Sequence, residues 1–195
     1  ARSSFGKGQG DLIADLMAYQ QWSSLRTKGV DKREIRSWCE QNFLSMQTLH
    51  DIASNRAQYL SSLKETGLIP ITYSSPAPSS TPVSYNQYNN NTTLLRALIA
   101  GAFNPQVARI ELPDKKFAAS VSGAVALDPE ARTIKYFNQE NGRVFVHPSS
   151  TLFDAQSFPG GAQFVSYFSK MATSKIFIRD LTRERLPFEL PPCHS

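Results

Sequence analysis

Apolar residues in the first third of the chain recur every three or four positions, which is the period of amphipathic helices. Asp11 can cap a first helix that runs to about Arg26. Asp31, followed by Glu34 three residues later, resembles a capping box and starts a short second helix. The pattern therefore predicts that the chain opens with a helical bundle.

A third and longer helix is predicted from Ser45, its N-cap, to Thr66. Gly67 fits the position just beyond the helix end, where the backbone turns left-handed. Tyr19 and Trp22 extend the apolar stripe of the first helix, and we expect them to be core aromatics.

The composition changes abruptly over residues 70–91, where Pro, Ser, Thr, Tyr and Asn replace the aliphatic residues. Such a segment cannot bury enough surface to offset its chain entropy, so it is predicted to be a linker or a low-complexity insertion. Its tyrosines could stack on bases, but we expect them to be inert.

An apolar helix is predicted next, capped by Thr92 or Thr93 and ended by Asn104-Pro105. It is apolar almost all round, so we expect it to be buried between the helical part and the C-terminal half of the chain.

From Gln106 onward the apolar residues alternate with polar ones, which is the period of half-buried strands. The predicted strands cover residues 107–112, 118–127, 133–137, 143–146, 165–170 and 174–179. On the last of them, Ile176 and Ile178 share one face and Lys175, Phe177 and Arg179 the other.

Short strands after a helix predict a small antiparallel barrel of the OB type. The expected class is α+β, with a helical-bundle portion over residues 1–69, a linker or insertion over 70–91, and a helix plus OB-fold over 92–195. A proline-rich tail from residue 183 is expected to lie extended over the surface.

Composition adds a mild preference for polyanionic partners, because the net charge is +5 and the sequence pI is about 9.3. No apolar run is long enough to span a membrane, and no signal peptide is evident at the first residues. The sequence begins without Met, so we expect it to be a piece of something larger.

The cysteines and histidines show no metal-ligand spacing, so no metal site is expected. Cys39 and Cys193 fit no paired framework, which favours a reducing compartment, the cytoplasm or the nucleus. The chain also lacks a phosphate-binding loop, a nucleophile elbow and paired carboxylates in its β half, so no catalytic residue is expected.

Loops rich in hydroxyl groups, with one histidine and several cations, follow two of the predicted strands. The first contains His147, Ser149 and Ser150, and the second contains Thr173, Ser174 and Lys175. Such loops can bind a phosphate backbone without reading sequence. The plain alternative is the solvated rim of an ordinary barrel.

Five segments in the same order resemble the C-terminal region of eukaryotic DEAH/RHA-type (DExH-box) RNA helicases, which holds the end of a ratchet domain and an OB-fold. They are Asp11–Trp22, Trp38–Leu49, Leu94–Ile110, Val146–Ser150 and Thr173–Asp180.

The resemblance implies a module that closes over single-stranded RNA, or DNA, as it leaves the helicase channel. It places nucleic-acid contacts at His147, Ser149 and Ser150 and at Thr173, Ser174 and Lys175, while Lys170 and Lys175 add charge. Pro148 stands where relatives carry Lys or other residues, so a direct phosphate contact is lost there.

ATP and Mg²⁺ would belong to two RecA-like domains of the parent protein, with no cofactor in this chain. Besides nucleic acid, the implied partners are those RecA-like domains and protein activators, with no membrane. A second hypothesis is therefore a protein-interaction platform that docks regulators. A third, a stand-alone hydrolase, has no supporting motif.

Overall fold

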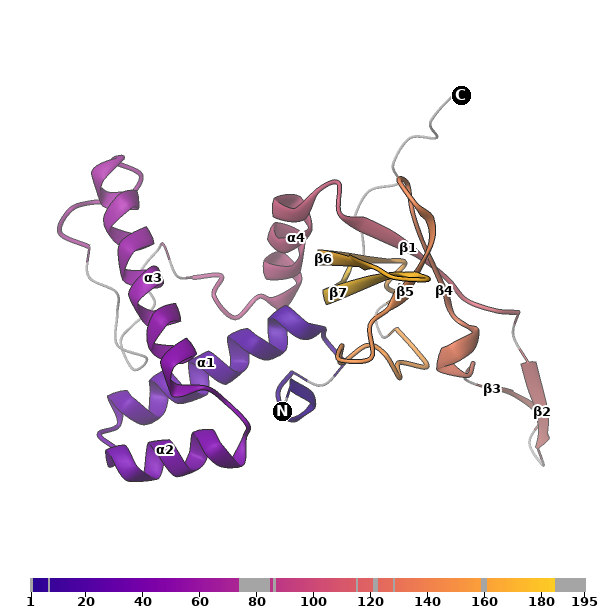
Figure 1. Cartoon of the computed structure of the whole chain (residues 1–195), viewed down its shortest axis with the longest axis horizontal. Helices are drawn as coiled ribbons and strands as arrows, with labels where there is room; N and C mark the ends of the chain where they lie inside the picture. Colours follow the sequence, from indigo (N-terminus) through magenta and orange to yellow (C-terminus); the bar gives the residue numbers. More distant parts are fainter. Residues whose placement is uncertain are drawn as a thin grey trace. The chain divides into compact units, whose positions relative to one another are not determined.

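A computed structural model describes residues 2–6, 8–73, 85, 87–114, 116–120, 123–127, 129–158 and 161–184 (Figure 1). The chain divides into two compact units. The helical unit contains residues 15–90 and residues 3–5 of the lead-in, whereas the barrel unit contains residues 6–14 and 91–195 together with Arg2. The first four residues of the first helix therefore belong to the barrel unit.

The expected helices of the N-terminal part are confirmed. They are α1 (Asp11–Thr27), α2 (Lys32–Gln41) and α3 (Met46–Glu65). Asp31 caps α2 by accepting a hydrogen bond from the Arg33 backbone N–H, and Ser45 caps α3 by accepting from Thr48.

The core of the helical unit is built around Trp22, which is fully buried, as expected of a core aromatic. Ile35, Cys39 and Leu49 complete the buried cluster. Gly67 adopts a φ of 73°, as predicted for the residue that follows the third helix. Most of the predicted linker lies outside the described residues, namely 74–84 and 86.

The fourth helix, α4 (Thr92–Phe103), departs from two predictions. Its cap is Asn91, whose side chain accepts from the Leu94 N–H, and not Thr92 or Thr93. The prediction that α4 is buried was also wrong, because Leu98 is 61% exposed. Within its own unit, one side of α4 packs on strands of the barrel. An apolar composition on all sides of the helix was therefore not sufficient evidence that the whole helix is buried.

The barrel consists of β1 (Val107–Glu111), β4 (Lys135–Asn138), β5 (Gly142–Val146), β6 (Phe164–Ala172) and β7 (Ile176–Glu184). It closes in the order β1-β4-β5-β7-β6 (Figure 1). Among the strand pairs that the structure describes, β5 and β7 run parallel and the others antiparallel. The α+β class and the OB-type barrel are thus confirmed.

Side chains that alternate along the strands fill the barrel with Ile110, Tyr136, Val144, Val165 and Leu181 among others. The predicted strand 118–127 was wrong as a single element. It is a hairpin of β2 (Lys116–Ser120) and β3 (Gly123–Leu127), which forms a separate two-stranded sheet. Both arms of a hairpin continue the same two-residue period, so periodicity alone could not separate them.

The last strand continues to Glu184, beyond its predicted end at residue 179. The extended tail was predicted from residue 183, but residues 183 and 184 belong to β7, and the remainder, 185–195, lies outside the described residues. Among the helices that the structure describes, none is long and apolar enough to cross a membrane.

Candidate nucleic-acid interface

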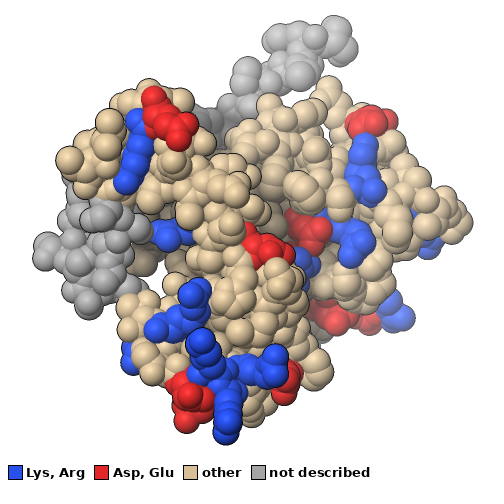
Figure 2. All heavy atoms as spheres, turned by 60° about the vertical axis from the view of Figure 1, so that its left-hand side comes forward, with Lys and Arg blue, Asp and Glu red and all other residues tan. Residues whose placement is uncertain are grey.

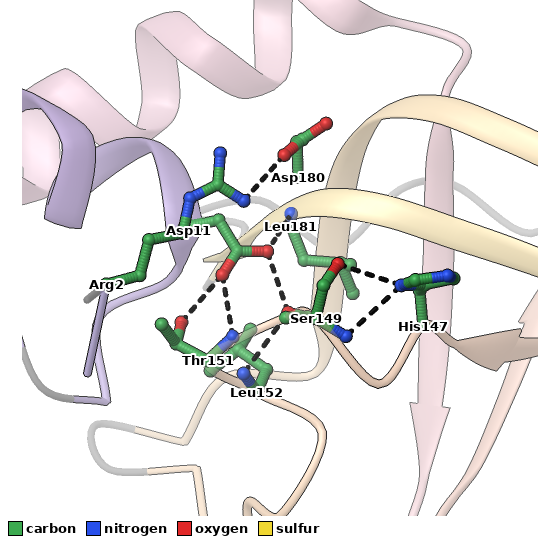
Figure 3. Close-up of polar contacts among 9 residues, drawn as sticks. Arg2, Asp11, His147, Ser149, Thr151, Leu152, Asp180 and Leu181 are labelled. Atoms are coloured by element: carbon green, nitrogen blue, oxygen red, sulfur yellow. Dashed lines mark hydrogen bonds and ion pairs between the residues drawn. The ribbon is translucent and has the colours of Figure 1, made fainter. Parts of the chain in front are cut away.

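The loop after β5 is folded around His147. The backbone N–H of His147 donates to the Ile178 carbonyl of β7 at 3.1 Å. The His147 Nδ1 atom accepts from the Ser149 backbone N–H at 3.1 Å, and the Ser149 hydroxyl lies 2.8 Å from the same nitrogen (Figure 3). Because a backbone N–H can only donate, Nδ1 is the acceptor, and the neutral ring carries its proton on Nε2. The ring therefore presents a donor away from the loop, next to an exposed Ser149.

Ser150 lies on the opposite side of this loop and is 7% exposed. Its hydroxyl donates to Asp11 Oδ2 at 2.7 Å. In this structure Ser150 therefore supports the loop from within, whereas Ser149 faces solvent.

Asp11 is the buried anchor of the loop, with a relative exposure of 0%. Its carboxylate also accepts from the Thr151 N–H at 2.7 Å, the Thr151 hydroxyl at 2.8 Å and the Leu181 N–H at 2.9 Å (Figure 3). One side chain thus ties the first turn of α1 to the loop and to β7. The sequence predicted Asp11 as a helix cap and missed this role, because its partners are 139 to 170 residues away.

Gly10 brings Asp11 to this position. It forms a bridge with Thr182 of β7 and has a φ of 112°. A Cβ atom at Gly10 would lie 2.6 Å from the Leu181 carbonyl oxygen and 2.8 Å from the Thr182 Cα. Only glycine fits such a close approach of two backbones without a shift. Nearby, Arg2 and Asp180 form an ion pair at 2.7 Å.

The turn between β6 and β7 is closed by bonds within itself. The Thr173 N–H and hydroxyl both donate to the Lys175 carbonyl, at 2.9 and 3.1 Å, and the Lys175 N–H donates to the Thr173 hydroxyl at 3.4 Å. Ser174 is exposed at the tip. The Thr173 hydroxyl is engaged in the turn, so Ser174 and Lys175 are the groups that the turn presents to solvent.

Lys170 lies near this turn but is already paired. Its ammonium donates to Glu140 and, at 3.2 Å, to the Asn141 side-chain oxygen. The hydrogen bond to Glu140 raises the pKa of Lys170. Lys170 therefore reaches a phosphate only in competition with Glu140.

The parallel register of β5 and β7 places the two loops at opposite ends of this strand pair. Phe145 lies opposite Phe177, and Val146 lies opposite Ile178. Because side chains alternate, the valine and isoleucine are buried and the two phenylalanines lie on the outer face. The prediction that Phe177 and Ile178 lie on opposite faces of the last strand is thereby confirmed, whereas Lys175 lies in the turn before β7.

We call this outer face the β5–β7 strip, and it consists of Arg143, Phe145, His147, Lys175 and Phe177. The rings of Phe145 and Phe177 are 6.1 Å apart, and the His147 ring meets that of Phe177 edge-on at 5.9 Å. The Arg143 Cζ and Lys175 Nζ atoms lie 4.9 and 4.7 Å from the centre of the Phe145 ring. Aromatic and cationic groups thus form one continuous surface between the two loops.

A groove of about 370 Å³ runs along the strip. Pro148 and Phe153 line it besides the strip residues, and Asp154 is the acidic residue in its lining. In the part of the chain that the structure describes, neither Arg143 nor Lys175 forms an ion pair. The groove therefore combines apolar walls with two cations that have no anionic partner there.

A second buried carboxyl group in the barrel unit, Glu184, belongs to neither loop. It is 3% exposed and accepts a hydrogen bond from the Ser166 hydroxyl at 3.3 Å. Burial raises the pKa of Glu184 to about 8, although the bond from Ser166 acts in the opposite direction.

No group of three or more metal-binding side chains occurs among the described residues.

Comparison with known proteins agrees with the architecture. Residues 95–184 match the family described as oligonucleotide/oligosaccharide-binding (OB)-fold.

Relatives that match nearly the whole chain define the wider group. The chain is 39% identical over 189 residues to a putative DEAH-box ATP-dependent helicase of Mycosarcoma maydis, covering 93% of this chain and 12% of that protein. It is 37% identical over 191 residues to a putative ATP-dependent RNA helicase of Schizosaccharomyces pombe, covering 93% and 13%. It is 30% identical over 187 residues to one of Mus musculus, covering 90% and 13%.

The resemblance to DEAH/DExH-box RNA helicases is therefore confirmed. The chain spans only about an eighth of the length of these relatives, 12 to 13%.

Proposed function

We propose that this chain is an accessory region of an ATP-dependent RNA helicase, and that its barrel unit binds single-stranded nucleic acid without reading sequence. In this proposal the strand passes the barrel as it leaves the helicase channel. ATP and Mg²⁺ would be bound by RecA-like domains elsewhere in the parent protein, which acts in the cytoplasm or the nucleus. In this proposal the chain itself supplies no catalytic group.

The observation that carries the proposal is the fixed loop after β5. Asp11 holds the loop from inside through three hydrogen bonds, from Ser150 and Thr151, and accepts a fourth from Leu181 of β7, so the loop that carries His147 and Ser149 is fastened to the barrel. A preformed loop that presents the Nε2–H group of His147 binds a phosphate without first having to become ordered. Lys175, at the other end of the strip, adds a positive charge without an acidic partner among the described residues.

Fluorescence anisotropy of a labelled single-stranded RNA at several salt concentrations tests this proposal. Two variants would be compared with the unmodified chain. The first combines Ser149→Ala, Lys170→Ala and Lys175→Ala. The matched control combines Arg109→Ala and Lys135→Ala, which also removes two cations from the barrel, but cations that pair with Glu111.

The first variant should bind about ten-fold more weakly, and the slope of log K against log salt should shrink by about 0.7 to 1.4, because Lys175 contributes one contact and Lys170 contributes only as far as it leaves Glu140. The control should bind nearly normally. Lys170→Ala alone should have the smaller effect of the two lysines, because Glu140 already holds its charge. Equal loss in both variants would contradict a site at the two loops.

If the first variant bound RNA as tightly as the unmodified chain, the RNA would have to bind another surface. Figure 2 shows Lys and Arg side chains gathered at the level of α2, with some acidic ones beside them. Five exposed cations lie there: Arg26, Lys28, Lys32, Arg33 and Arg36. Charge reversal on α2 would then remove binding instead.

A protein-interaction platform is the second candidate function, and one observation in the helical unit favours it. A groove of about 640 Å³ follows α3 and is lined by Ile52, Tyr59 and Leu63 among others. Leu68 and Ile71, just beyond α3, are also exposed. Apolar surface of this extent suits a protein regulator or activator, whose binding would depend only weakly on salt.

A further inference from the structure

The β5–β7 strip offers more than phosphate contacts, because its centre is aromatic. Side chains two residues apart on one strand face are separated by about 6.6 Å. Along β5 the order is therefore a cation at Arg143 and a ring at Phe145, with His147 directly after the strand. Lys175 lies directly before β7, and Phe177 lies within β7 opposite Phe145. The register thus places ring beside ring at Phe145 and Phe177, and both cations lie over the Phe145 ring.

The rings in the middle row are accessible. Phe145 and Phe177 are partly exposed, and both line the groove of about 370 Å³. Their planes are inclined at 51°, so they are not stacked face to face on one another, and both side chains keep some exposed surface. A flat ring that enters the groove would meet these surfaces, with Pro148 and Phe153 beside it.

Because the strip is positively charged, a purely apolar ligand would not be its best binding partner. Arg143 and Lys175 stand over the Phe145 ring and have no ion-pair partner in the described residues. A ligand that carries an anion next to a flat ring satisfies both features at once. A nucleotide unit of a single strand has this chemistry, and stacking on aromatic side chains accepts every base.

We infer that a nucleobase of the bound strand stacks in this groove against Phe145 and Phe177, while Arg143 and Lys175 bind the phosphates that flank it. The inference rests on the proposed function and specifies the contact at the centre of the same surface. Polar groups that could read a base edge are few among the lining residues, chiefly Arg132 and Asp154. Arg132 already pairs with Glu130, so it is less available to form a hydrogen bond with the edge of one particular base. We therefore expect the groove to accept all four bases.

The test compares a single-stranded RNA with a base-free strand of the same length and charge, each labelled and titrated with the 195-residue chain. The unmodified chain should bind the base-bearing strand about ten-fold more tightly, in keeping with one or two stacked bases. Equal affinity for the two strands would overturn the stacking proposal and needs no variant.

Three variants assign the effect to the strip. Phe145→Leu combined with Phe177→Leu should lose most of the preference for the base-bearing strand, with an unchanged salt dependence. Phe145→Tyr keeps the ring and should bind normally. Phe168→Leu, on the same barrel but outside the groove and with Phe168 59% exposed, is the matched control. Thermal unfolding of each variant would check that the barrel is intact.

The outcomes separate the two proposals. Salt-dependent RNA binding that is insensitive to the phenylalanine variants would overturn the stacking inference and leave the proposed function standing. No RNA binding even at low salt would overturn both. An equal loss of affinity for both strands in the leucine variant would mean that the rings only support the fold.

Discussion

The loops at the two ends of the β5–β7 strip are held in opposite ways. The loop after β5 is fastened from inside by Asp11, a residue more than a hundred positions away in the sequence. The turn between β6 and β7 is closed by Thr173 and Lys175 alone and is exposed. The first is rigid by tertiary contact and the second by local bonding, so the two should respond very differently to single substitutions.

Asp11→Asn should have the largest effect, a loss of about 2–4 kcal/mol in the free energy of unfolding. The amide would turn at least one donor toward the Ser150, Thr151 and Leu181 donors, leaving buried groups without acceptors. Urea unfolding measures the loss. Asp51→Asn on the exposed face of α3 is the control and should stay within about 0.5 kcal/mol. Similar values for the two variants would contradict the anchoring role.

Gly10→Ala should follow, with a loss of about 2–3 kcal/mol, because its Cβ would press on the backbone of β7. Gly29→Ala is a matched control, since Gly29 also has a positive φ, of 72°, but no atom within 4 Å of the added Cβ. The control should lose about 1 kcal/mol. Chemical denaturation measures the free energy of unfolding of both variants. The loss in Gly29→Ala reports the backbone strain that both share, and the additional loss in Gly10→Ala reports the crowding against β7.

The Glu184→Gln substitution tests whether burial or hydrogen bonding determines how much a buried carboxyl group contributes to folding stability. Asp11 accepts four hydrogen bonds, whereas the bond from Ser166 is the one the structure shows for Glu184. Burial raises the pKa of Glu184 from 4.5 to about 8, so folding takes up a proton between these values. Its contribution to stability is then complete below pH 4.5 and is lost as the pH rises through 8.

The glutamine variant should therefore be more stable than the unmodified chain at pH 9, by about 1–2 kcal/mol, and nearly equal at pH 4. Thermal unfolding across this pH range measures the difference. A variant that is less stable at pH 9 would show that the ionised carboxylate is favourable in the barrel.

Thr173→Val should have the smallest effect, about 0.5–1 kcal/mol, because its bonds lie at an exposed turn. RNA affinity should fall slightly, since Lys175 is less well placed. Ser174→Ala, which leaves the turn bonds in place, is the control for the change in stability. A loss as large as that of Asp11→Asn would remove the contrast between the two loops.

Sequence patterns recovered the elements whose signals are local. The caps Asp31 and Ser45 and the positive φ of Gly67 are fixed by neighbours within a few residues, and the barrel strands by a period of two. The burial of α4 was mispredicted because it depends on the elements that pack against each side of the helix. The hairpin of β2 and β3 was missed because its turn interrupts no periodicity.

The candidate site was predicted only as far as its loops. Ser149 and Lys175 are exposed and His147 is half-buried, whereas the buried position of Ser150 and the Glu140 partner of Lys170 depend on tertiary contacts that no motif shows. Phe145 beside Phe177 follows from a parallel register between strands that are thirty residues apart. Nothing in the sequence indicated that Asp11 anchors the loop, apart from the run of hydroxyl residues after Pro148, whose hydrogen-bond donors need an acceptor.

Photocrosslinking of the unmodified chain to a single-stranded RNA containing 4-thiouridine tests the central claim most directly, because it requires no variant. After digestion, mass spectrometry would locate the crosslinked residues. We expect crosslinks within residues 143–149 and 174–179, on the two strands and the loops that bound the strip. Crosslinks confined to α2 or α3, with none on the strip, would contradict the account and move the strand to the helical unit.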